Sequence, residues 1–145
     1  MKFLIVFAFL ILAALKIIGA SLSKEDAITF ATGCKDVAGA SDADLEAIVK
    51  HQPVESKEGK CMRACVLKKF EIMSDEGKLL KDAALEISKS LIKNEEQKEL
   101  VAGIIDICDE LEVSDDHCEA AEEYGRCWRS ETESKGITSA EDLLK

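Results

Sequence analysis

Six cysteines at fixed intervals constrain this chain more than any other feature. They give the spacing C-x26-C-x3-C-x42-C-x9-C-x8-C, and they are Cys34, Cys61, Cys65, Cys108, Cys118 and Cys127. An even number of cysteines in a small exported chain indicates three disulfide bonds, because the cell exterior is oxidising. Zinc sites usually show a C-x2-C pair, or cysteine and histidine at short spacing. The shortest interval here is C-x3-C, so we expect no metal.

The N-terminus has the pattern of an export signal. Lys2 precedes an unbroken apolar run over residues 3–15, and small residues then offer a cleavage site before Ser21. A membrane span needs about twenty apolar residues, and Lys16 ends this run too early. We therefore predict a secretory signal peptide over residues 1–20.

The remainder, residues 21–145, is long enough for one domain with one modest core. Because residues 1–20 hold two lysines and no acid, this domain has a net charge of −12, against −10 for the whole chain. That balance disfavours nucleic acid and anionic membrane surfaces as partners, since both attract clustered Lys and Arg. We predict a polar C-terminal tail over residues 130–145.

Apolar side chains recur every three or four residues along most of the domain, and no run alternates as a β-strand would. This spacing predicts an all-α fold of about six short helices. Their stretches are 27–37, from Ser41 until Pro53 stops the helix, 61–73, 80–91, from Asn94 to Cys108, and 115–129.

Polar residues predict where several of these helices begin. Ser41 with Asp44 has the pattern of a capping box. Asn94 and Ser114 are the predicted N-caps of the last two helices. The segment 74–77, Ser-Asp-Glu-Gly, predicts a turn.

The helical positions of the cysteines limit how they pair. Cys61 and Cys65 lie one turn apart on one face, where a mutual bond would stretch the Cβ–Cβ distance beyond the ~4 Å of a disulfide. Cys118 and Cys127 point to opposite sides of their helix, which therefore reaches two neighbours. The count alone leaves fifteen connectivities open. Short helices clamped in this way do not form a tight parallel bundle, which favours an interior hollow.

The full set of intervals resembles the insect odorant-binding (pheromone-binding and general odorant-binding) family, in which C-x3-C and C-x8-C are the most diagnostic. The stretches 61–65, Cys-Met-Arg-Ala-Cys, and 115–121, Asp-Asp-His-Cys-Glu-Ala-Ala, are similar to fly general odorant-binding members. The resemblance extends from the first helix to Trp128. It implies six helices around an internal apolar pocket, with bonds Cys34–Cys65, Cys61–Cys118 and Cys108–Cys127.

The resemblance also implies a function. Such a protein is a soluble extracellular carrier of odorants, pheromone-like molecules or other semiochemicals through sensory lymph to membrane odorant receptors. It acts as a monomer or weak dimer, without enzymatic activity, cofactor or stable membrane insertion. In many members an aromatic residue directly after the sixth cysteine lines the pocket, and Trp128 holds that position. Several members place a serine two residues after the third cysteine to bind an alcohol, but this chain has Leu67 there.

The candidate pocket wall consists of apolar residues on the helical stripes. Stripes of this kind are ordinary core in most proteins, and the resemblance is what makes them pocket candidates. Burying a ligand with about ten methylene-like carbons gains about 8 kcal/mol of binding free energy. After the cost of association, this permits roughly micromolar affinity. The candidates are Phe30, Met62, Val66, Phe70, Met73, Leu80, Ala84, Ile87, Leu91, Val101, Ile104, Ile105 and Trp128.

Other interpretations of the polar residues are weaker. The acidic run over residues 109–123 lacks the spacing of a calcium loop, so we expect a solvated face. His51 and His117 are expected to be exposed polar residues rather than pH switches.

Rival protein classes fit less well. A secreted phospholipase would need a His–Asp pair beside a glycine-rich calcium loop, and no residues here suggest a nucleophile with its base. Saposin-like proteins carry a C-x2-C near their start. A lipid-binding, defence or venom component on the same disulfide-linked helical fold stays open as an alternative.

Overall fold

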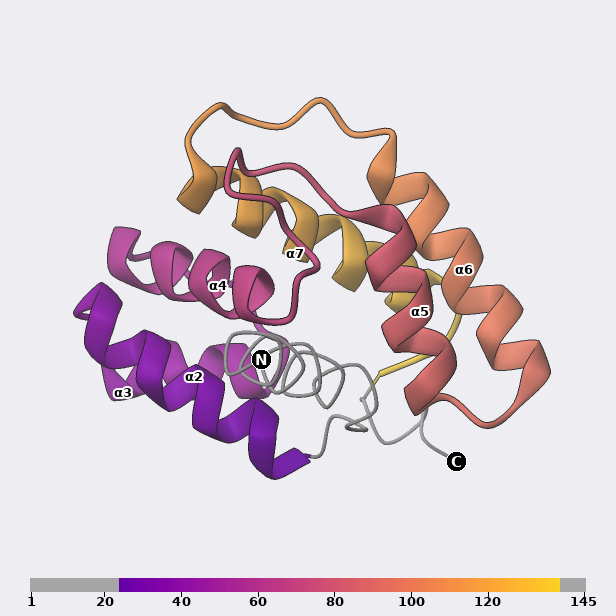
Figure 1. The fold of residues 1–145 in the computed structure, drawn as a ribbon, viewed down its shortest axis with the longest axis horizontal. Helices are drawn as coiled ribbons and strands as arrows, with labels where there is room; N and C mark the ends of the chain where they lie inside the picture. The colour runs from indigo at the N-terminus through magenta and orange to yellow at the C-terminus, as the bar shows by residue number, and fades with distance from the viewer. Residues whose placement is uncertain (1–23, 139–145) are drawn as a thin grey trace, which may run out of the picture.

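The structure, a computed structural model, describes residues 24–138 (Figure 1). The predicted signal peptide and residues 139–145 of the predicted tail lie outside this range. The described part contains no β-strand, only an isolated bridge between Met73 and Leu79, and none of its helices could cross a membrane. The predicted all-α fold is confirmed by helices α2 (Lys24–Ala38), α3 (Asp42–Val49), α4 (Lys57–Lys69), α5 (Lys81–Leu91), α6 (Glu95–Asp109) and α7 (His117–Ser134).

The helices form two groups that α7 connects. Helix α4 packs against α2, α3 and α7, whereas α5 packs against α6, and α6 packs against α7. Figure 1 shows α2, α3 and α4 on one side and the α5–α6 pair on the other. Helix α7 therefore carries the main contacts between the two sides.

Three apolar clusters follow this division. The first joins α2 and α4 through Ala31, Cys34 and Met62. The second lies between α4 and α7 and contains Ala64, Met73, Ala120, Ala121 and Tyr124. The third, the α5–α6 cluster, contains Ala84, Ile92, Val101 and Ile105, with Trp128 of α7 packed against it.

The beginnings of α3 and α4 share one carboxylate. The predicted capping box is confirmed, because Ser41 accepts a hydrogen bond from the Asp44 amide and donates its own amide to the Asp44 side chain. Ser56, the N-cap of α4, donates its hydroxyl to Asp44 Oδ1 over 2.7 Å and accepts from the Gly59 amide. These bonds, led by that from Ser56, hold the pKa of Asp44 below its usual value.

Gly59 is buried at this junction, where a side chain has no room. A Cβ atom there would lie 2.5 Å from Asp44 Oδ1 and 2.8 Å from Ser56 Oγ. We expect Gly59→Ala to lower the free energy of unfolding by about 1–3 kcal/mol, measured by urea denaturation. Gly103→Ala in α6 is the matched control, because a Cβ atom at that position would have nothing within 4 Å. That variant should gain up to about 1 kcal/mol from helix propensity, and equal effects would contradict the steric argument.

Helix α7 begins and ends later than the sequence predicts. The predicted N-cap, Ser114, is wrong: Asp116 caps the helix and accepts from the amides of Cys118 and Glu119. Its carboxylate satisfies two amides and complements the helix dipole. Those hydrogen bonds lower the pKa of Asp116. The helix continues to Ser134 rather than about Arg129, so the first residues of the predicted tail are helical.

The other predicted boundaries agree with the structure in part. Asn94 caps α6 through a bond from the Gln97 amide. The predicted turn at 74–77 is present, with Gly77 at φ 78° and its amide bonded to the Ser74 carbonyl. Helix α3 ends at Val49, before Pro53, and His51 at φ 56° then turns the chain.

Candidate ligand-binding site

Three disulfides join helices α2, α4, α6 and α7. They link Cys34 to Cys65, Cys61 to Cys118, and Cys108 to Cys127. This is the pairing that the family resemblance implies. Helix α4 is thereby bonded to α2 and α7, and α7 is also bonded to α6.

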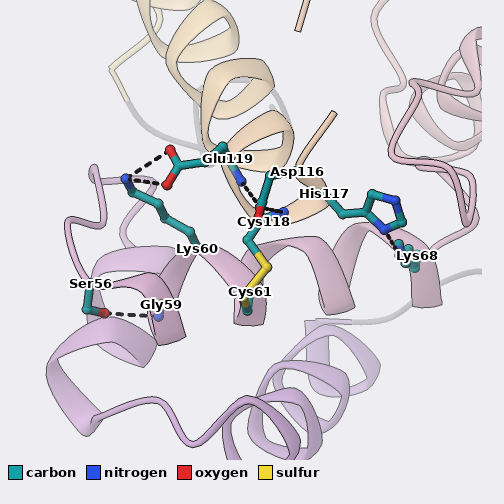
Figure 2. The surroundings of a disulfide bond; sticks show 9 residues. All are labelled: Ser56, Gly59, Lys60, Cys61, Lys68, Asp116, His117, Cys118 and Glu119. Carbon is teal, nitrogen blue, oxygen red and sulfur yellow. Dashed lines mark hydrogen bonds and ion pairs between the residues drawn. A yellow bond between two sulfur atoms is a disulfide. The ribbon is translucent and has the colours of Figure 1, made fainter. Parts of the chain in front are cut away.

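Charged and polar contacts support the disulfide between α4 and α7 (Figure 2). On one side of the Cys61–Cys118 bond, Lys60 Nζ donates to both carboxylate oxygens of Glu119, at 3.1 and 3.0 Å. On the other side, Lys68 Nζ lies 2.9 Å from His117 Nδ1. These contacts and the disulfide together hold the first turn of α7 against α4.

One turn further along α7, a buried carboxylate lies between two guanidinium groups. Glu122 is 2% exposed. Its Oε2 accepts from Arg63 Nε at 2.9 Å, and its Oε1 accepts from Arg129 Nη2 at 2.6 Å. Charge-assisted bonds of this kind are strong where water is excluded, and the loss of one partner leaves a buried charge uncompensated.

A glycine in α7 makes room for this network. A Cβ atom on Gly125 would lie 3.2 Å from both Arg63 Cδ and Arg129 Nη1. The glycine therefore lets both arginine side chains lie close to the backbone of α7.

The network also fixes the loop between α3 and α4. Arg63 Nη2 donates to the Gln52 carbonyl at 2.8 Å. His51, the residue before, has an exposed side chain. The pKa of His51 is nevertheless lowered. The larger cause is desolvation of the ring, and the second is the positive charge of Arg63 and Arg129. His51 is therefore mostly neutral near pH 7.

This loop and the last turns of α7 border a hollow of about 790 Å³ that is open to solvent. Trp128 forms part of its wall and also packs against the α5–α6 cluster. The hollow has mixed character, with apolar side chains next to charged ones. It is lined by Lys50, His51, Gln52, Pro53, Val54, Glu55, Lys60, Glu122, Arg126, Trp128, Arg129, Ser130, Thr132, Glu133, Ile137 and Thr138.

The predicted pocket residues are spread over the molecule. Trp128 is the one that lines this hollow, and the role of the others in binding stays a prediction. Phe30 and Phe70 pair edge to face, with ring centroids 5.3 Å apart. Leu80 and Leu91 are exposed, and Ile87 is half-buried. The remaining residues are buried or half-buried in the core: Met62, Val66, Met73, Ala84, Val101, Ile104 and Ile105.

Sequence reasoning missed the buried charges of the site. The acidic run at 109–123 was expected to form a solvated face, but Glu122 is buried, and Glu123 accepts from the Ser114 amide. Gly125 in the middle of a helix was the available signal, because a glycine there indicates close approach of another segment. His117 was expected to be exposed, but it is half-buried beside Lys68.

The described part of the chain is all-α with three disulfides, and its fold is that of an odorant-binding protein. Residues 21–131 match the PBP/GOBP family, and the chain belongs to that family. The family and the fold together support a carrier of small hydrophobic ligands.

Two relatives in Drosophila melanogaster are similar over most of the chain. General odorant-binding protein 28a is 40% identical over 137 residues, which cover 88% of this chain and 96% of that protein. General odorant-binding protein 19d is 37% identical over 117 residues, covering 80% and 78%. The solved structure of the 28a protein matches with a TM-score of 0.70 and 41% identity, over 77% of this chain and 93% of that chain. Both relatives are named as odorant-binding proteins rather than enzymes.

Proposed function

We propose that this chain is a secreted carrier that binds small hydrophobic molecules and transports them through sensory lymph to odorant receptors. Family membership and the identity with the 28a protein support this role. The observation that carries the proposal is the position of Trp128 between the α5–α6 cluster and the hollow. A ligand in the hollow gains an aromatic wall there, and about 790 Å³ is a volume typical of small-molecule sites.

Trp128 provides the test, because it is the only tryptophan of the chain. We expect saturation with dodecan-1-ol to shift its emission to shorter wavelength and to reduce quenching by acrylamide, since the ligand displaces water from the ring. Binding itself is followed by displacement of a neutral fluorescent probe, with alcohols, aldehydes, esters and fatty acids as competitors.

The variant Trp128→Phe is the control, since it keeps an aromatic wall and should still bind the probe. Displacement without any change in Trp128 emission would mean that the ligand binds elsewhere. If no compound in the panel displaced the probe, the carrier proposal would fail. Transport in sensory lymph is tested separately, by locating the protein in sensory organs with a specific antibody.

A further inference from the structure

All three arginines of the chain gather at the hollow. Arg126 and Arg129 line it, and Arg63 is bonded to the Gln52 carbonyl in its wall. The chain as a whole has 29 acidic against 19 basic residues, and its other sixteen basic residues are lysines. The arginines are therefore concentrated at one place, against the overall charge of the molecule.

The buried network at this place has more positive than negative charge. Glu122 is shared by the guanidinium groups of Arg63 and Arg129, which leaves a surplus of one positive charge. Arg129 Nη1 is buried without a hydrogen-bond partner in the described part of the chain. Arg126 is exposed at the hollow, and no ion pair joins it to another described residue.

The other charged groups of the hollow do not neutralise this surplus. Lys50 and Lys60 pair with carboxylates outside the lining, those of Glu46 and Glu119. Glu55 and Glu133 also line the hollow, but no ion pair joins either of them to Arg126 or Arg129 in the described part of the chain. The buried network therefore keeps a surplus positive charge beside the hollow, and this charge favours an anionic group there over a neutral one.

Resting on the carrier function above, we propose that the hollow selects hydrophobic molecules with an anionic head group, such as a carboxylate. The exposed guanidinium group of Arg126 binds the head group, and the surplus positive charge of the network at Arg129 attracts it. The apolar part lies along Trp128, Pro53 and Val54. Guanidinium suits this task because its planar set of donors matches a carboxylate, and because it always carries its charge.

Two ligands with the same apolar chain, dodecanoate and dodecan-1-ol, test the selection. At about pH 7.5 the carboxyl group of dodecanoate is ionised. By isothermal titration calorimetry we expect dodecanoate to bind about tenfold more tightly or better, as a charge-assisted hydrogen bond permits. In Arg129→Gln the preference for dodecanoate over dodecan-1-ol should fall, because the network loses its surplus positive charge. The Arg63–Glu122 pair remains in this variant, which protects the fold.

Two further variants test the selection even if Arg129→Gln does not fold. Arg126→Gln, at an exposed position, should lose part of the preference. Lys78→Gln removes the same charge from an exposed residue that does not line the hollow, and it should keep the whole preference. Equal binding of both ligands to the unmodified protein would overturn the selection and leave the carrier role intact. If neither ligand bound, the selection would be overturned, and the displacement panel above would decide the carrier role separately.

Discussion

Removal of the Cys61–Cys118 disulfide by Cys61→Ala with Cys118→Ala is expected to lower the free energy of unfolding by about 4 kcal/mol. This bond closes the longest loop of the three, with a sequence separation of 57 residues. In the loop-entropy account, the bond stabilises the fold because it restricts the unfolded chain. Urea denaturation of the oxidised variant and parent gives the difference.

The pair Cys108→Ala with Cys127→Ala is the matched control for this prediction. Its bond also involves α7, but the separation is 19 residues, and the expected loss is about 3 kcal/mol. A larger loss in the control than in the Cys61–Cys118 variant would show that native contacts, rather than loop length, set the contribution of each bond.

Glu122→Gln is expected to lower the free energy of unfolding by about 3–5 kcal/mol. The amide has nearly the shape of the carboxylate, but it leaves the guanidinium groups of Arg63 and Arg129 buried without a counter-charge. The same denaturation measurement applies, and thermal unfolding should show a lower midpoint.

Glu119→Gln provides a control three residues earlier on α7. Glu119 pairs with Lys60, and its side chain is 46% exposed, so solvent weakens the ion pair. Its loss should cost at most about 1 kcal/mol. Similar costs for both variants would mean that burial of Glu122 does not strengthen its ion pairs.

Local sequence patterns predicted most of the fold. The capping box at Ser41 and Asp44, the cap at Asn94 and the turn at 74–77 depend on neighbours in the chain, so the residue types alone indicated them. The start of α7 was missed because Ser114 and Asp116 are both good capping residues. The pattern did not distinguish them, whereas in the structure Ser114 accepts from the Asp116 amide ahead of the helix.

The candidate site was less predictable, because it depends on contacts between distant segments. Arg63 and Glu122 are 59 residues apart, and each belongs to a segment rich in charged residues, which indicates exposure when taken alone. The hollow forms where the loop at 50–55 lies beside the end of α7. Helical periodicity describes single helices, so it does not predict which segments lie beside each other. Trp128 was predicted as a wall residue through the resemblance, since its place after the sixth cysteine is a local feature.

The overlap of the three disulfides has a consequence for resistance to proteases. Every peptide bond between Cys34 and Cys127 lies within at least one disulfide-closed loop, because the loops 34–65, 61–118 and 108–127 overlap in turn. A single cut anywhere in this range therefore releases no fragment. The two pieces stay covalently joined through the disulfide that spans the cut.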